Sequence, residues 1–303
     1  MYKISICIPT YKRPLLLKKL IYSITACNIN RSLIKDYNII IVDNDVCMTA
    51  KSVVTEIKET LSNNYRIDYH SFSVKGLSNV RNELIKNALL LNPDFIVFVD
   101  DDEHVTLEWL NELVKTITMN NGDIAMGPVI SSIDSQVSSD ISCWLERANY
   151  LNNTRINFIR TGNLIINANF FLRSNIWFDP RFNTTGGEDT YFGIQMMKKG
   201  ASIYWAANAI VYETVPNSRA NILWLIRRYY NGSIMFTNIL KFEKEYIKLT
   251  KKTLLSFLYL LVGVCAIFII PIPIKRRYYG LLKFSEGLGG IAALLNIRHH
   301  EYK

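Results

Sequence analysis

Four consecutive acidic residues, Asp100 to Glu103, follow the five apolar residues Phe95 to Val99. The apolar stretch has the composition of a buried β-strand. Adjacent carboxylates repel one another and a strand does not need them, so the cluster suggests that a cation neutralises it. Carboxylate oxygens suit Mg2+ or Mn2+, and such ions often share their ligands with the phosphates of a substrate. The alternative is an acidic turn that caps a helix starting near Thr106.

The segments around this cluster predict an α/β fold. Strand-like and helix-like segments alternate with short connections, which is typical of a mostly parallel sheet flanked by helices. Ligands of such sheets bind at the carboxyl ends of the strands. We expect strands at 4–8, 37–42, 66–72 and 95–99, and helices at 14–26, 49–61 and 77–91.

Polar side chains stand at the ends of the predicted strands. Residues 9–13 (Pro-Thr-Tyr-Lys-Arg) follow the first strand, and Asp43 follows the second. The third predicted helix opens at Gly76 and carries Arg81, a guanidinium that can hold a base or a phosphate. Taken singly, Thr10 and Asp43 can also be helix caps, and Arg81 can form a surface ion pair. Because parallel strands end at one edge of a sheet, we expect these groups to form one site.

A second acidic pair, Glu188 and Asp189, follows two glycines at 186 and 187. The glycines permit a loop with unusual backbone dihedrals. The two carboxylates open a predicted helix at 191–198 and so stand at its positive end. A carboxylate in that place can act as a general base, and ordinary N-capping is the alternative.

Residues between and after these motifs are candidates for binding an acceptor. Trp144 can stack on a sugar, and it can equally pack in a core. Arg219, Arg227 and Arg228 have the guanidinium forks that bind diphosphates, unless they are solvated charges on a helix. The tract 131–142 is rich in Ser and Asp, and we expect a loop there.

The C-terminal region differs from the rest in charge and hydropathy. The chain has 303 residues and a net charge of +9, and residues 241–303 hold 11 of its 35 Lys and Arg but 4 of its 26 Asp and Glu. Residues 254–274 carry no charge, and an apolar helix of this length can cross a bilayer core. Basic residues on both flanks of this run suit anionic lipid headgroups.

We expect residues 254–274 to associate with a membrane. The segment can span the bilayer, bend back at Pro271 and Pro273, or lie in the plane of the membrane, and a buried soluble helix is the alternative. A second apolar stretch, 278–297, can complete a hairpin or lie along the interface.

The motifs, in their order along the chain, resemble those of family-2 inverting glycosyltransferases with the GT-A fold. The resemblance covers about residues 3–235, and the chain looks most like bacterial polysaccharide transferases related to succinoglycan glucosyltransferases. It is carried by residues 6–13 (Ile-Cys-Ile-Pro-Thr-Tyr-Lys-Arg), the Asp43 turn, 76–82 (Gly-Leu-Ser-Asn-Val-Arg-Asn), 99–103 (Val-Asp-Asp-Asp-Glu) and 186–189 (Gly-Gly-Glu-Asp).

The resemblance implies a general base, a metal site and a donor site. Asp189 would be the base, with Glu188 beside it. Asp102 or Glu103 would touch Mn2+ or Mg2+, and Glu213 is a further candidate because the histidine that many relatives have near this position is absent. The nucleotide would be bound by Pro9, Thr10, Tyr11, Arg13, Asp43, Arg81, Asp100 and Asp101, with Asp43 accepting a hydrogen bond from uracil if the donor is a UDP-sugar. The acceptor or a diphosphate would meet Trp144, Asn163, Gly187, Arg219, Arg227 and Arg228.

The sequence therefore predicts a membrane-associated, metal-dependent, inverting glycosyltransferase. The donor would be a nucleoside-diphosphate sugar, in first place a UDP-sugar, and the acceptor a glycan or a polyprenyl-diphosphate-linked glycan of a bacterial surface polysaccharide. The start of the chain is strand-like and lacks a secretory signal, so we expect the protein at the cytoplasmic face of the inner membrane, where the tail contacts anionic lipid. The expected domains are a catalytic domain at 1–235, divided into a nucleotide-binding half 1–105 and an acceptor half 106–235, and a membrane-associating tail at 236–303.

Two other functions fit parts of the sequence. A phosphotransferase can use a strand-end Asp-x-Asp motif, but His104 stands where Thr or Val is usual, and the 186–189 motif would have no role. A catalytically inactive scaffold that binds sugar nucleotides is the non-enzymatic alternative, and the presence of both Asp102 and Asp189 argues against it. No nucleic-acid motif occurs, and lipid explains the basic tail better than DNA does.

Overall fold

The computed structural model describes residues 1–61, 65–266 and 277–297. The chain forms two compact units, and each is described by itself. The first consists of Met1–Ile130, Ala148–Asn183 and Glu188–Thr214, and the second of Ser131–Arg147, Thr184–Gly187 and Val215–Lys303. This division differs from the expected boundary at 235/236, because the second unit starts earlier and takes in two short preceding segments.

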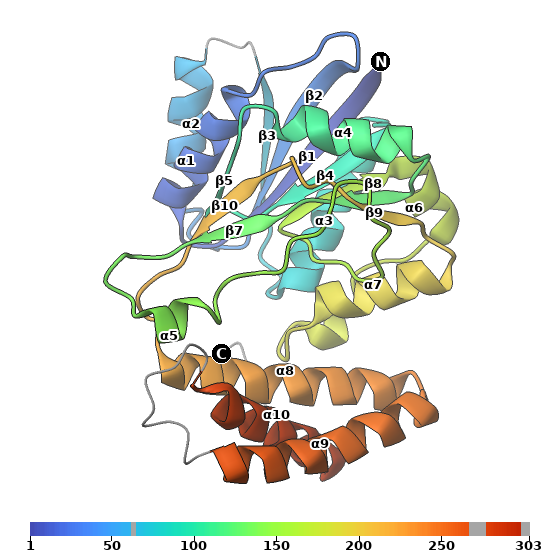
Figure 1. The fold of residues 1–303 in the computed structure, drawn as a ribbon. Coiled ribbons are helices and arrows are strands. Elements are labelled where there is room, and N and C mark those ends of the chain that lie inside the picture. The colour runs from blue at the N-terminus through green and yellow to red at the C-terminus, as the bar shows by residue number, and fades with distance from the viewer. Residues whose placement is uncertain (62–64, 267–276, 298–303) are drawn as a thin grey trace. The chain divides into compact units, whose positions relative to one another are not determined.

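The first unit is built on a seven-stranded sheet of order β3-β2-β1-β4-β8-β6-β9 (Figure 1). β1 pairs in parallel with β2 and β4, β2 with β3, and β6 with β9, whereas β8 runs antiparallel to β4 and β6. The expected mixed, mostly parallel sheet is confirmed. Its strands are β1 Tyr2–Thr10, β2 Ile34–Asp43, β3 Arg66–Ser71, β4 Phe95–Val99, β6 Ile124–Met126, β8 Asn163–Asn167 and β9 Ile203–Trp205.

The strand order reverses at β1. Strands β2 and β3 lie on one side of β1, and β4 lies on the other. In open α/β sheets, the crevice outside the carboxyl ends of the strands at such a switch point is where ligands bind. Thr10 ends β1 in register with Asp43 of β2, and Asp100 follows the end of β4. The topology thus brings the predicted strand-end residues to one edge.

Helices cover both faces of this sheet. Ile4, Ile6 and Ile8 of β1 pack with α1, α2 and α4, whereas Cys7 packs with α3, α6 and α7. Successive residues of a strand point to opposite faces, so a strand covered on both sides reads as a continuous apolar run. The helices are α1 Pro14–Thr25, α2 Lys51–Thr60, α3 Leu77–Leu89, α4 Trp109–Met119, α6 Ala168–Ser174 and α7 Glu188–Lys198, with a 3-10 turn at Pro180–Phe182.

A small sheet of order β5-β10-β7 adjoins the acidic run. It consists of β5 Glu103–Val105, β10 Val211–Thr214 and β7 Val129–Ser132. β5 and β10 are antiparallel, with Glu103 opposite Glu213. The helix that we expected near Thr106 therefore starts later, at Trp109, because residues 103–105 pair as a strand.

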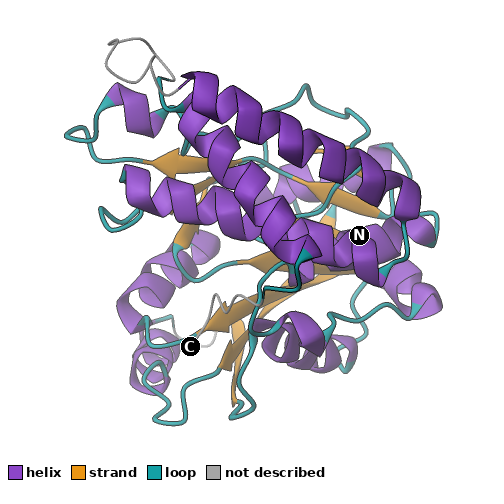
Figure 2. Ribbon diagram, turned by 90° about the horizontal axis from the view of Figure 1, so that it is seen from below, coloured by secondary structure: helices purple, strands orange, loops and turns teal. Residues whose placement is uncertain are grey.

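The second unit is helical. Its helices are α5 Ser139–Ser142, α8 Ile222–Phe242, α9 Tyr246–Ala266 and α10 Tyr279–Leu294. α10 packs against both α8 and α9, and the three long helices lie side by side (Figures 1 and 2). The tract 131–142 is not entirely loop, since it contains α5. Among the described residues, α9 is the helix long and apolar enough to cross a membrane, and it begins earlier than the predicted run 254–274. Pro271 and Pro273 lie outside the described residues.

Candidate active site

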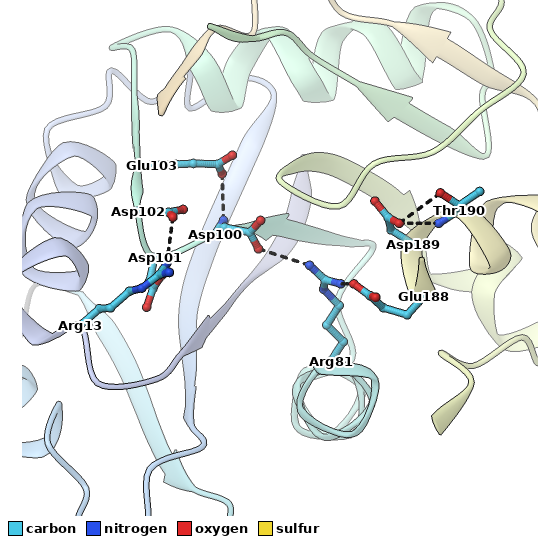
Figure 3. A network of polar contacts seen from close by, with 9 residues as sticks. All are labelled: Arg13, Arg81, Asp100, Asp101, Asp102, Glu103, Glu188, Asp189 and Thr190. Carbon is cyan, nitrogen blue, oxygen red and sulfur yellow. Dashed lines mark hydrogen bonds and ion pairs between the residues drawn. The ribbon is translucent and has the colours of Figure 1, made fainter. Parts of the chain in front are cut away.

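The acidic run lies where β4 ends, and a guanidinium from the end of β1 reaches it (Figure 3). Arg13 directly precedes α1, and its Nη1 donates at 3.1 Å to Asp101 Oδ1 and at 2.8 Å to Asp102 Oδ2. Thr10 Oγ1 donates to Asp101 Oδ2 at 2.8 Å. Burial raises the pKa of Asp101 to about 6, against the opposing effects of Thr10 and Arg13. The chain itself therefore supplies part of the positive charge that the run requires.

Glu103 stabilises the turn that follows β4. Its Oε2 accepts the backbone N–H of Asp100 at 2.8 Å. Burial, and then the charge of Asp100, raise the pKa of Glu103 well above its usual value. A Cβ on Gly162 would stand 2.5 Å from Glu103 Oε1, so a side chain there would have to displace the carboxylate. Gly162 is far from Glu103 along the chain, so only the fold reveals this contact.

Arg81 links the acidic run to the second acidic pair. Its Nη1 lies 2.5 Å from Glu188 Oε1, and its Nη2 lies 3.4 Å from Asp100 Oδ1. Figure 3 shows the guanidinium between these two carboxylates, and it also lies 5.5 Å over the ring of Phe178. Burial lowers the pKa of Arg81, but the charges of Glu188 and Asp100 outweigh it and the pKa is raised. Burial raises the pKa of Glu188, against the charge of Arg81.

Residues distant in the sequence fix the start of α3, which carries Arg81. Gly76 has a φ of +115°, and a Cβ there would overlap the side chain of Asn183. Asn183 Oδ1 accepts the N–H of Ser78 at 2.9 Å, and Ser78 Oγ donates at 2.9 Å to the carbonyl of Asp179. Asn183 has no motif around it in the sequence, so only the fold reveals that it caps α3.

Asp189 stands in the first turn of α7, beside the buried Glu188. Its Oδ1 accepts the N–H of Thr190 at 2.6 Å and the hydroxyl of Thr190 at 3.3 Å. The side chain is partly exposed, and it stands at the positive end of the helix. The two neighbouring carboxylates thus have different surroundings: Glu188 is buried and pairs with Arg81, whereas Asp189 is partly exposed.

Asp43, the expected uracil contact, is fully buried at the end of β2. Its Oδ1 accepts the N–H of Asp45 at 2.9 Å, and its Oδ2 accepts from the N–H of Ala50 at 3.1 Å and from the hydroxyl of Tyr69 at 2.8 Å. These bonds shape the turn into α2. A hydrogen bond from Asp43 to a nucleotide base would have to replace one of them, and it stays a prediction.

The neighbouring residues Pro9 and Tyr11 differ in exposure. Pro9 is buried within β1, whereas Tyr11 is exposed, with Lys12 Nζ 5.2 Å from the centre of its ring. The exposed ring lies just beyond the carboxyl end of β1. It is therefore in a place where a base can stack, as expected for a nucleotide site.

Asn163, an expected acceptor contact, is used inside the fold. Its Nδ2 donates to the carbonyls of Pro128 at 3.0 Å and Ala209 at 2.6 Å, and its Oδ1 accepts from Trp109 Nε1 at 2.9 Å. The side chain is buried. Because both ends of the amide are engaged, Asn163 joins β8 to neighbouring segments, and a direct acceptor contact, which would have to replace one of these bonds, stays a prediction.

The other expected acceptor residues belong to the second unit. Trp144 packs with its ring centre 6.2 Å from those of both Tyr229 and Tyr279, which favours the packing alternative. Gly187 has a φ of +89°, Arg219 lies in the turn before α8, and Arg227 and Arg228 are exposed on α8. Acceptor or diphosphate binding by these residues stays a prediction.

Two carboxylates of the acidic run fit a metal ion. In the part of the chain that the structure describes, no group of three or more His, Cys, Asp or Glu side chains is arranged to hold one. The side chains of Asp100 and Asp102 are 36% and 18% exposed, and Mg2+ is commonly held by one or two carboxylates while phosphates and water complete its shell. Glu103 and Glu213, which we expected as ligands, are both buried in the small sheet.

Comparisons with known proteins agree with this fold. The model of Glycosyl transferase family 2 matches residues 5–177, and that of Glycosyl transferase family group 2 matches residues 95–285. The succinoglycan biosynthesis protein ExoM of Rhizobium meliloti (strain 1021) is 28% identical over 236 residues, which are 76% of this chain and 72% of that protein. The chondroitin synthase of Escherichia coli is 24% identical over 257 residues, 72% of this chain but 35% of that protein.

Solved structures share the fold at low sequence identity. TarS of S. aureus in complex with UDP-GlcNAc has a TM-score of 0.56 and 14% identity, covering 97% of this chain and 92% of that one. GalNAc-T7 with UDP, GalNAc and Mn2+ has a TM-score of 0.55 and 13% identity, covering 71% of this chain and 44% of that one. The expected GT-A fold is confirmed. Since the first family model covers more than half of its residues, the chain belongs to glycosyl transferase family 2.

Proposed function

We propose that the protein transfers a sugar, with inversion, from a nucleoside-diphosphate sugar to a hydroxyl of a glycan or lipid-linked acceptor. The observation that carries the proposal is the link through Arg81 between Asp100, at the switch point of the sheet, and the pair Glu188 and Asp189. The relative named for succinoglycan biosynthesis and the neighbour that binds UDP-GlcNAc support a UDP-sugar donor and a role in making a bacterial surface polysaccharide.

The donor's diphosphate would lie at the carboxyl ends of β1 and β4. Asp102, with Asp100, would hold Mg2+ or Mn2+, which supplies positive charge to the departing diphosphate. Arg13 now donates to Asp102, and its side chain is 41% exposed. A diphosphate can therefore take over the guanidinium of Arg13 and leave Asp102 free as a ligand.

Asp189 would act as the general base. It accepts the proton of the acceptor hydroxyl while that oxygen attacks the anomeric carbon from the face opposite the phosphate. The new carbon–oxygen bond forms as the bond to the phosphate oxygen breaks, and its electron pair leaves with the nucleoside diphosphate. One such displacement inverts the anomeric carbon. The bonds from Thr190 hold Asp189 Oδ1, so that Oδ2 is the oxygen that receives the proton.

Calorimetry with UDP-, GDP- and dTDP-sugars tests this function. We expect one nucleotide class to bind in the presence of Mn2+ and to lose most of its affinity in EDTA. The variant Asp189→Asn should bind the donor as well as the original protein but lose transfer by on the order of 10²–10⁴-fold. Asp36→Asn, an exposed acid on β2 of the same unit, is the matched control. If a folded sample binds no sugar nucleotide, or if Asp189→Asn transfers at an unchanged rate, the proposal is wrong.

We also propose that the second unit attaches the protein to the cytoplasmic face of the inner membrane. The apolar helix α9 and the basic composition of residues 241–303 support this. Flotation of the full chain with anionic vesicles tests it, and a protein that stays at the bottom of the gradient would contradict it.

A further inference from the structure

Helix α9 has one face that is filled by α10. Ser256 and Gly263 are buried there, and a Cβ on Gly263 would overlap the side chain of Phe284. On the α10 side, a Cβ on Gly287 would stand 2.6 Å from the carbonyl oxygen of Ser256. Small residues thus let the two backbones approach closely, and nothing else can enter this contact.

The opposite face of α9 is exposed to solvent. Five large apolar residues recur there at spacings of three and four, which places them in one stripe along the helix. Every one of them is half exposed or more, and a contiguous apolar patch of this kind marks an interaction site. They are Leu254, Phe257, Leu258, Leu261 and Val264.

Positive charge adjoins this stripe at the start of the helix. Lys251 precedes Leu254 by three residues and Leu258 by seven, so it lies on the same side of α9, and it is exposed. Lys248 precedes it by one turn and lies 3.3 Å from Glu245, a surface pair that anionic headgroups can replace. An apolar stripe with lysines at one end is complementary to an anionic bilayer.

The packing of α10 prevents lipid from surrounding α9. α10 also packs on α8, where Ser285 Oγ donates to the carbonyl of Ile226 at 2.7 Å and Lys241 Nζ donates to the carbonyl of Ala293 at 2.9 Å. The next residues of α8, Arg227 and Arg228, are exposed. A crossing α9 would carry this bundle and its arginines into the hydrocarbon, which is costly.

A charged cluster at the contact between α9 and α10 also argues against a membrane-spanning α9. Glu286 of α10 lies 3.2 Å from Lys252 Nζ and 2.8 Å from Lys283 Nζ. At the far end, Gly280 of α10 contacts Ala266, so the chain has already returned beside α9.

We infer that α9 lies in the plane of an anionic bilayer, with its stripe below the headgroups and Lys248 and Lys251 at the phosphates. α10 and α8 stay on the aqueous side. The inference deepens the proposed membrane attachment and rests on it, and it excludes a membrane-spanning α9.

Vesicle flotation of the full chain first measures how strongly the protein binds to the membrane. With phosphatidylglycerol vesicles we expect the double variant Leu258→Glu/Leu261→Glu to bind at least tenfold more weakly. The variant Leu151→Glu, which changes an exposed leucine of the first unit, should bind unchanged. Lys248→Gln/Lys251→Gln should lose on the order of tenfold on phosphatidylglycerol and little on phosphatidylcholine. Equal binding by all variants would overturn the inference.

Nitroxide labels then measure how deeply two positions of α9 lie in the bilayer. After the exposed Cys47 and Cys265 are changed to Ser, single cysteines are placed at Leu254 and Val264, ten residues or about 15 Å apart along the axis. Equal depth, within a few Å, supports the in-plane helix. A depth difference near 15 Å with binding intact overturns it but leaves membrane attachment standing, and absence of binding overturns both. Donor binding measured on the same samples reports separately on the glycosyltransferase function.

Discussion

Replacing Arg81 with Met would leave Glu188 as a buried carboxylate without its partner. The side chains are 4% and 8% exposed, and 2.5 Å separates Nη1 from Oε1. Removing one member of a buried ion pair typically costs 3–5 kcal/mol, because the remaining charge is left uncompensated. We expect Arg81→Met to lower the free energy of unfolding by about 3–5 kcal/mol at pH 7, out of a total that is typically about 5–15 kcal/mol.

A double-mutant cycle separates the pair from other effects of the substitutions. Glu188→Gln alone removes the nearer carboxylate partner of the buried Arg81 and leaves it with Asp100, at 3.4 Å. This variant should therefore also be less stable. The double variant removes both charges and should lose less than the two single losses added together, by about 2 kcal/mol or more. Urea unfolding followed by tryptophan fluorescence measures the three values. Lys18→Met is the matched control, since its pair with Glu56 is exposed and is worth at most about 1 kcal/mol.

The pH dependence of Arg81→Met gives an independent check. Burial raises the pKa of Glu188 in the folded protein, and loss of the Arg81 charge removes an opposing effect, so the pKa should rise further. A carboxylate with a raised folded-state pKa stabilises the fold below its unfolded pKa and loses this contribution as the pH rises through the folded value. The deficit of the variant should therefore shrink towards acid pH. A single-mutant loss below about 1 kcal/mol, or additive losses, would refute the reasoning.

Three further predictions concern the acidic run. Burial raises the folded-state pKa of Asp101 to about 6. As the pH rises from 3.5 to 7, the original protein should therefore lose up to about 3 kcal/mol of stability relative to Asp101→Asn. Urea unfolding at each pH measures the difference, and parallel stability curves would contradict this. Gly162→Ala should destabilise by about 1–3 kcal/mol, because its Cβ meets Glu103 Oε1 at 2.5 Å, and Gly232→Ala, with open space around it, is the thermal-unfolding control. Asp102→Asn should keep the fold but lose the Mn2+ dependence of donor binding in calorimetry, and a variant that responds to EDTA like the original protein would exclude Asp102 as a ligand.

The sequence predicted the elements whose patterns are local. β1, β2 and β4 are buried on both faces, so they read as apolar runs, and the helices between them show their periodicity. β5 was missed, since Glu-His-Val has no strand composition and pairs only because β10 lies beside it. The same limit applies to side chains. The hydrogen bonds of Asn163 were not predicted, because its partners Trp109, Pro128 and Ala209 are brought to it by the fold and do not neighbour it in the sequence.

The charges of the site explain why binding of a diphosphate there would require a further cation. The network in Figure 3 holds six carboxylates and two guanidinium groups. Burial raises the pKa of Asp101, Glu103 and Glu188, which reduces the negative charge. The partly exposed carboxylates of Asp102 and Asp189 still oppose the approach of a diphosphate. Arg81 is committed between two carboxylates, so Arg13 is the cation of this network that can turn to a phosphate. A donor that brings further negative charge must therefore bring a cation with it, and this electrostatic requirement is the physical reason to expect metal-dependent binding at Asp102.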